Sequence, residues 1–352
     1  MSNIAQVLDT IQSDIDKGRI KEALKALKKA VPRADASKDD HEKARAHFLL
    51  GKALTRDGEL VESAKEYLKA LDIYSNIPDG NGMAETLLGL GVLHRWKSDF
   101  ATAEEFLEQF LDQARELGNE DQIGQAHTEL GVVLAERSIL EGAIAHFNEA
   151  IATLKRTKNA YQLSRAYHSL GESLKRKDKF IEAFENFEEC IKIAEELGLE
   201  RNIAYSSASA AECLAKSGHY DRADKYVERA IAVFKKTDDQ IGLSDAMRVH
   251  GLVEWMKGNV KEAENLFNKA LEMIKVRDVP GNEVQLRFDY AEFLLGTGRL
   301  EEATEQADEA IKMARRIGGV AYENKAWSIK NKVMEAKSGQ VAMKKKPARL
   351  KK

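Results

Sequence analysis

The strongest constraint on the fold of this chain is a forty-residue period that runs through almost its whole length. Small residues return at this interval in two columns, and bulky residues return in a third. The first small column is Gly51, Gly91, Gly131, Gly171, Ala211, Gly251 and Ala291; the second is Ser63, Ala103, Ala143, Ala183, Ala223, Ala263 and Ala303; the bulky column is Tyr67, Leu107, Phe147, Phe187, Val227, Phe267 and Ala307. A fixed period of this length is the signature of a solenoid, in which each repeat packs mainly on its neighbours.

Each period predicts two amphipathic helices with a short break between them. The eight predicted repeats cover residues 4–31, 43–75, 83–115, 123–155, 163–195, 203–235, 243–275 and 283–315. From the second repeat on, each first helix should end at a turn signal, namely Asp57-Gly58, Lys97-Ser98, Arg137-Ser138, Lys177-Asp178, Ser217-Gly218, Lys257-Gly258 or Thr297-Gly298. We expect the small columns to let neighbouring helices approach closely, and the bulky column to fill the space that they leave.

The two ends of the chain depart from the period. In the first repeat the second helix should stop at Val31, and residues 32–42 should form a connection, so that Pro32 lies outside the helix. Near the C-terminus one further helix, at about 320–337, carries Trp327 on its apolar stripe and should cap the last repeat. We therefore expect an all-α solenoid domain at 1–338 and a disordered basic tail at 339–352.

Composition agrees with a folded, helix-rich protein, because 43% of the residues are hydrophobic and 32% are charged. There is no apolar run long enough to span a bilayer, and the two cysteines offer no disulfide framework, so we expect a cytoplasmic protein without membrane contact. The net charge of −3 hides an asymmetry. Seven Lys or Arg and no acid lie in residues 337–352, so the remaining body carries −10.

The repeats resemble the tetratricopeptide repeat, because Leu130-Gly131, Leu134, Ala143, Phe147 and Ala150 fall at that family's spacing. The resemblance covers about residues 4–337. The forty-residue length is similar to the longer-helix variants of kinesin light chains, the LGN/Pins polarity adaptors and the bacterial Rap-type regulators. The family's terminal proline is absent from its column, which fits longer second helices. The resemblance implies a right-handed superhelix of about eight helix-turn-helix repeats.

The resemblance also implies that the first helices line a concave groove, which holds a peptide segment of a partner. The groove positions that it selects are Arg45, Phe48, Lys52, Arg56, Arg95, Trp96, Arg165, His168, Lys175, Arg176, Lys216, Arg248 and Trp255. Over all eight first helices these positions hold nine basic and seven acidic residues, which predicts an acidic peptide as ligand. The family's carboxylate clamp and its groove asparagines are absent, so no chaperone tail or polarity partner is expected. For Trp96 and Trp255, packing against a neighbouring repeat is as good an interpretation as an exposed anchor.

The sequence offers no catalytic constellation, because there is no nucleophile, base and orienting group to name together. No Gly-rich phosphate loop is present, and we expect neither a cofactor nor a metal. The eight histidines include no pair at i, i+4, so satisfied or surface histidines are expected. Cys190 and Cys213 are interpreted as small buried hydrophobes.

The leading hypothesis is a non-enzymatic scaffold or adaptor that binds a protein or peptide. The alternative is a nucleic-acid- or ribosome-associated factor that is tethered by the basic tail, which would be the only part to contact nucleic acid. A third hypothesis, the sensor half of a regulator, follows from the Rap-type resemblance, although the chain carries no helix-turn-helix or output domain.

Overall fold

The computed structural model describes residues 4–277, 279–316 and 320–344, with backbone alone at 320–322, 325 and 339–344. Within these ranges the chain forms 17 α-helices and no strand. Eight consecutive helix pairs are followed by a single last helix. The all-α solenoid of eight repeats with a capping helix is therefore confirmed.

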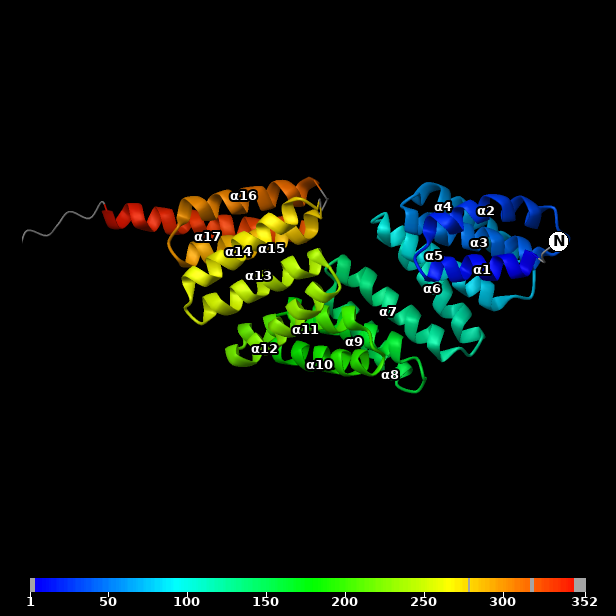
Figure 1. Ribbon diagram of the computed structural model, residues 1–352, viewed down its shortest axis with the longest axis horizontal. Helices are drawn as coiled ribbons and strands as arrows, with labels where there is room; N and C mark the ends of the chain where they lie inside the picture. The colour runs from blue at the N-terminus through cyan, green and yellow to red at the C-terminus, as the bar shows by residue number, and fades with distance from the viewer. Residues whose placement is uncertain (1–3, 278, 317–319, 345–352) are drawn as a thin grey trace, which may run out of the picture. The chain divides into compact units, whose positions relative to one another are not determined.

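Backbone contacts divide the chain into two compact units, with the division between Ser173 and Leu174. Figure 1 labels the helices in chain order. The first unit contains α1 (Ile4–Asp16), α2 (Ile20–Asp35), α3 (Asp40–Asp57), α4 (Leu60–Tyr74), α5 (Gly80–Trp96), α6 (Phe100–Glu116), α7 (Glu120–Glu136), α8 (Leu140–Leu154) and most of α9 (Ala160–Arg176). The second contains α10 (Phe180–Glu196), α11 (Glu200–Lys216), α12 (Tyr220–Lys236), α13 (Gln240–Met256), α14 (Val260–Lys275), α15 (Pro280–Gly296), α16 (Leu300–Arg316) and α17 (Val320–Lys344).

The turn signals end the first helices as predicted. The residue two positions before each second helix has a positive φ, and these residues recur every forty positions. They are Gly18, Gly58, Ser98, Ser138, Asp178, Gly218, Gly258 and Gly298. Ser138 is typical: its N–H donates to the Ala135 carbonyl at 2.9 Å, and the N–H of Ile139 donates to Leu134 at 2.8 Å. These bonds satisfy carbonyls that the helix end would otherwise leave unpaired.

The small and bulky columns meet inside each repeat. A Cβ atom placed on Gly131 would lie 2.6 Å from the ring of Phe147, and one placed on Gly91 would lie 2.6 Å from Leu107. Because this is closer than carbon atoms normally approach, only glycine lets α7 and α5 lie so near their own second helices. The predicted close approach is therefore confirmed at these glycines of the first small column and the bulky residues that face them.

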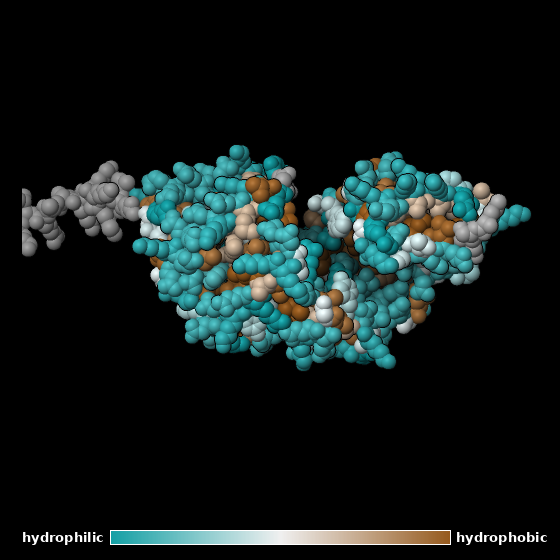
Figure 2. Space-filling view, in the orientation of Figure 1, coloured by the Kyte–Doolittle hydropathy of each residue, from teal (hydrophilic) through white to brown (hydrophobic). Residues whose placement is uncertain are grey.

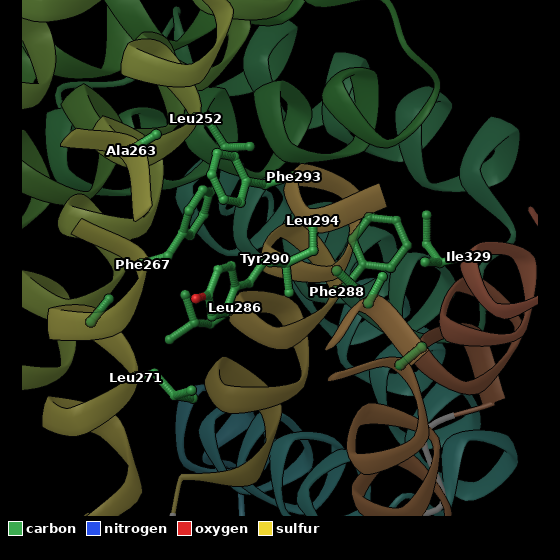
Figure 3. Packing of buried hydrophobic residues seen from close by; sticks show 14 of the residues in the cluster. Leu252, Ala263, Phe267, Leu271, Leu286, Phe288, Tyr290, Phe293, Leu294 and Ile329 are labelled. Atoms are coloured by element: carbon green, nitrogen blue, oxygen red, sulfur yellow. The ribbon is translucent and has the colours of Figure 1, made fainter. Parts of the chain in front are cut away.

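The bulky residues also form the core at the end of the second unit (Figure 3). There Phe267 of α14 stacks on Tyr290 of α15, with ring centroids 5.3 Å apart. Phe293 lies 5.4 Å from Phe267 and is fully buried. The capping helix α17 adds Ile329 and Val333 to the same cluster, so it covers apolar surface that the last pair would expose.

The structure corrects two predicted boundaries. Helix α2 continues to Asp35 and contains Pro32, whereas the sequence pattern predicts that the helix ends at Val31. Pro32 has no N–H to donate to the carbonyl of residue 28, and its ring crowds that carbonyl, but only three helical residues follow it, so the helix ends within one turn of the lost bond. Helix α17 continues to Lys344 instead of ending near residue 337, because Ser338 and Gly339 are followed by good helix formers. The remainder of the predicted tail, 345–352, lies outside the described residues.

Polar side chains cover most of the visible face of each unit, with apolar side chains exposed in narrow bands between them (Figure 2). None of the helices in the described ranges combines the length and the apolar character needed to cross a membrane.

Candidate functional site

The first helices form the tighter side of each stack. The backbones of α1, α3, α5 and α7 approach one another in succession, as do those of α11, α13 and α15. No such approach occurs between successive second helices in the described part of the chain. Within each unit the first helices therefore lie closer to one another than the second helices do. We call the inner row those residues of each first helix that correspond to positions 45, 48, 49, 52, 55 and 56 of α3.

In the first unit, two inner-row cations of α3 pair with carboxylates of α1. Arg45 Nη2 lies 2.6 Å from Asp9 Oδ1, and Lys52 Nζ lies 3.2 Å from Asp16 Oδ1. The side chains of Arg45 and Lys52 are 36% and 29% exposed, and both carboxylates are more than half exposed. Both cations therefore still reach solvent.

The other two candidates of α3 are used inside the fold. Phe48 is only 8% exposed, and its ring centroid lies 5.9 Å from that of Tyr67. Arg56 donates from Nη1 to the carbonyl oxygen of Ile15. Phe48 is therefore closed to a ligand, whereas Arg56 joins α3 to α1 and remains exposed.

Helix α5 contributes Arg95 and Trp96. Arg95 Nη1 lies 2.7 Å from Glu136 Oε1 of α7, and its side chain is 18% exposed. Trp96 is 50% exposed. It is the large aromatic side chain that the inner row of the first unit leaves open to solvent.

Helix α9 contributes Arg165 and His168 to the first unit. Arg165 Nη2 lies 2.7 Å from Glu129 Oε1 of α7, and Arg165 Nη1 donates to Gln162 at 3.0 Å. Burial lowers the pKa of the Arg165 guanidinium, but the carboxylate of Glu129 outweighs it and raises the pKa above its ordinary value. The other oxygen of Glu129 is buried without a hydrogen-bond partner in the described part of the chain. His168 is half-buried.

In the second unit, Arg248 of α13 is 4% exposed and lies among three carboxylates. Its guanidinium nitrogens lie 2.8 Å from Asp245, 3.2 Å from Glu212 of α11 and 2.5 Å from Asp289 of α15. These contacts neutralise Arg248 and join three successive first helices. A side chain so engaged is part of the scaffold.

The remaining candidate cations of the second unit also meet neighbouring helices. Lys175 Nζ lies 3.5 Å from Glu212 and 6.0 Å from the centre of the Phe187 ring. Lys216 Nζ lies 3.9 Å from Glu292 of α15. Arg176 is exposed at the end of α9.

Trp255 packs between α13 and α15. Its ring meets Phe293 edge-on at 5.8 Å, and a Cβ atom on Gly296 would lie 2.6 Å from the indole. This is the packing arrangement that the sequence left open for both tryptophans. Of the two tryptophans, only Trp96 has a half-exposed side chain.

Sequence reasoning missed the carboxylates that balance the inner row. Asp9, Glu129 and Asp289 share one column of the period, next to the residues that were counted. With these three acids, nine basic residues face ten acidic ones. The sequence shows that these three acids recur in one column, but it does not show that this column lies on the same face of the helix as the cations.

Two further clusters lie outside the inner row. His127 and His146 meet at 3.0 Å between α7 and α8. Asp224, His250 and Glu254 bring three possible metal ligands together between α12 and α13. Cys190 and Cys213 are 1% and 0% exposed, so the prediction of small buried cysteines is confirmed.

Models of the tetratricopeptide repeat match residues 8–78, 82–156, 162–236 and 200–275. No curated protein matches the sequence.

Solved structures share the fold at low identity. The apo form of RapI is 16% identical with a TM-score of 0.69, covering 78% of this chain and 99% of its own. The Rap conjugation gene regulator of the plasmid pLS20, in complex with the Phr* peptide, is 14% identical with a TM-score of 0.58, covering 94% and 96%. Aspartyl phosphate phosphatase F from Bacillus subtilis is 14% identical with a TM-score of 0.59, covering 96% of each chain.

Proposed function

Because the chain belongs to the tetratricopeptide repeat family, we propose that it is a non-enzymatic adaptor that holds a peptide segment of a partner protein. The proposed binding surface is the inner row of the first unit, on α3, α5, α7 and α9. The partner segment is acidic, and Trp96 is its apolar anchor.

The observation that carries this proposal is the difference in exposure between the two units. In the first unit Arg45 and Lys52 reach solvent, and Trp96 of the same inner row is half-exposed. In the second unit Arg248 is buried among carboxylates and Trp255 packs on Phe293. Exposed aromatic and arginine side chains dominate the energies of protein interfaces. The first unit is therefore the better ligand surface.

The ion pairs of α3 suggest how an acidic ligand would bind. Asp9 and Asp16 are more than half exposed, and exposed pairs of this kind contribute only about 0–1 kcal/mol. A ligand carboxylate can therefore take the place of either aspartate at little cost. Arg45 and Lys52 are seven residues apart, or about 10 Å along the helix. A peptide in the polyproline II conformation has three residues per turn and rises about 3.1 Å per residue, so acidic side chains three positions apart lie on one face about 9 Å apart and would fit.

A peptide as ligand is supported by the Rap regulator of pLS20, whose structure contains the Phr* peptide. Aspartyl phosphate phosphatase F is named for a reaction, and its likeness to this chain extends to the fold alone. The described ion pairs of the inner row join a cation to a carboxylate and contain no Ser, Thr or Cys beside a base. We therefore assign no reaction to this surface.

The test is a titration with fluorescein-labelled peptides that carry Glu residues three positions apart around a leucine, compared with the same peptides in which Gln replaces Glu. Trp96→Ala should weaken binding by about 2 kcal/mol, which is roughly thirtyfold. Arg45→Glu/Lys52→Glu should abolish the preference for Glu peptides. Lys69→Glu is the matched control, because Lys69 is exposed on the second helix α4.

Equal affinity of wild type and both variants would contradict the proposal. The alternative function predicts a different result. A tail-bound nucleic acid should lose affinity steeply with added salt and should not bind a chain that ends at Lys344. Binding of the peptides by that shortened chain would favour the inner row.

A further inference from the structure

Three side chains of the second unit converge outside the inner row. One ligand atom from each of Asp224, His250 and Glu254 lies within 4.8 Å of the others. His250 and Glu254 are one turn apart on α13, and His250 Nε2 lies 4.0 Å from Glu254 Oε1. Asp224 comes from α12, the second helix of the preceding repeat. The cluster therefore exists only when these two repeats are packed together.

The carboxylates of this cluster are already oriented. The side chain of Glu254 is 10% exposed, and its Oε2 accepts a hydrogen bond of 2.6 Å from Asn259 Nδ2. This bond leaves Oε1 on the side of the cluster. Asp224 Oδ1 is buried and has no hydrogen-bond partner in the described ranges. A buried oxygen without a partner costs free energy, so Asp224 can gain from a further ligand.

A positive charge already occupies part of the cluster. Lys257 Nζ lies 2.8 Å from Asp224 Oδ2 and 2.7 Å from Glu254 Oε1. The side chain of Lys257 is 28% exposed and follows the last residue of α13. Its ammonium group can therefore move out to solvent without disturbing a helix interior.

We propose that Asp224, His250 and Glu254 form a binding site for a divalent transition-metal ion such as Zn²⁺, and that Lys257 is its internal competitor. One imidazole nitrogen and two carboxylate oxygens suit zinc, which leaves a fourth position for water. Ligand atoms about 2.1 Å from a tetrahedral ion lie about 3.4 Å apart, so each side chain must move inward by less than about 1 Å. The hydrogen bond from Asn259 is the kind of support that orients a ligating carboxylate.

The metal would join two repeats. Its ligands come from α12 and α13. The competing ammonium group belongs to Lys257, which lies with Asn259 in the turn between α13 and α14. Zinc should therefore raise the melting temperature of the chain, because it binds the packed state and has no assembled site in the unfolded chain.

The experiment is isothermal titration of Zn²⁺ into the full chain, after treatment with a chelator, together with thermal melting at each zinc concentration. We expect one equivalent to bind and the melting temperature to rise. His250→Ala should remove both effects. Lys257→Met should tighten zinc binding by about tenfold, which corresponds to about 1.4 kcal/mol. Co²⁺ in place of Zn²⁺ should give the visible absorption of a four-coordinate site in wild type and lose it in His250→Ala.

Two control variants separate this site from other histidines. His219 is exposed and is not one of the three clustered residues, and His146 belongs to the two-histidine contact of the first unit. Zinc binding should persist in His219→Ala and in His146→Ala. The proposal is overturned if zinc binding survives His250→Ala, if it disappears in His146→Ala, or if Lys257→Met leaves the affinity unchanged. All four variants must first give the helical circular dichroism of the wild type; because His250 is 24% exposed and its contact is long, its truncation should preserve folding.

Discussion

The Nδ1 atom of His127 on α7 lies 3.0 Å from the Nδ1 atom of His146 on α8. One ring must donate its N–H and the other must accept through a lone pair, so this contact requires at least one neutral imidazole. The equivalent positions of the preceding repeat hold Leu87 and Phe106, which are apolar. A titratable contact has thus taken the place of an apolar one in the fourth helix pair.

The histidine contact should make the chain less stable in acid. Burial is the largest cause that lowers the pKa of both rings below 6.5, and it prevails over the opposing charges of Glu104, Glu108 and Glu149. Because the pKa is lower in the folded state, the unfolded chain binds these protons more readily. This contribution to stability is complete above a pH of about 6.5 and is lost as the pH falls below it.

The measurement is thermal melting of wild type and His127→Leu/His146→Phe between about pH 7 and about pH 5. The double variant copies the apolar pair of the preceding repeat, so its advantage over wild type should grow as the pH falls. His219→Ala is the control, because His219 is exposed. Parallel pH profiles for the double variant and wild type would show that the contact does not titrate with folding.

Arg248 should be far more important for stability than Arg45, an inner-row cation whose partner is exposed. Arg248→Met leaves Glu212, Asp245 and Asp289 without their shared cation, and removal of one partner of a buried ion pair typically costs about 3–5 kcal/mol. Arg45→Met removes an exposed partner and should cost about 0–1 kcal/mol. Urea unfolding followed by circular dichroism measures both. Similar midpoints for the two variants would contradict the burial-based ranking.

Two glycines of the same column should respond differently to alanine. A Cβ at position 131 would lie 2.6 Å from Phe147, whereas a Cβ at position 251 would lie 3.3 Å from Phe267. Gly131→Ala should therefore lose about 1–3 kcal/mol through overpacking. At Gly251 the helix preference of alanine, about 0.5–1 kcal/mol, should offset most of the milder contact. The urea midpoints of the two variants test this, and Gly131→Leu should fall below both.

Ser98→Gly should stabilise the chain. Ser98 has φ +58°, a left-handed conformation that costs an L-residue roughly 1–2 kcal/mol, while glycine loses about 0.5–1 kcal/mol more entropy on folding. The balance predicts a higher melting temperature for Ser98→Gly. Gly58→Ala is the reverse change at the equivalent turn, with φ +90°, and should lower it. A melting temperature that rises in both variants would refute the conformational argument.

Most of the fold could be predicted from the sequence because the period repeats both the packing columns and the turn residues. Gly131 and Phe147 identify a close helix contact, and Ser138 identifies the turn between those helices. The period gives no information about the parts of the chain that lie outside it. That is why the ends of α2 and α17 were wrong: each boundary depends on a local balance between one unfavourable residue and the helix formers beside it.

The candidate site was less predictable, because its cations could be identified from the sequence but the carboxylates that pair with them could not. The partners of Arg45, Arg165 and Arg95 lie 36, 36 and 41 residues away, not forty. Those separations depend on how far one first helix is shifted along the next. The residue types in the sequence do not indicate that shift. The burial of Arg248 likewise depends on three neighbouring helices at once.

The ion pairs of the inner row have a thermodynamic consequence for any ligand. Each pair spans two successive first helices, so it contributes to the attraction between two repeats. A ligand that captures Arg45 releases Asp9 and weakens the junction between the first two repeats. Linkage requires the converse as well: a junction that is already loosened will bind that ligand more tightly. The stiffness of the solenoid at the junction between the first two repeats would therefore depend on whether the ligand is bound.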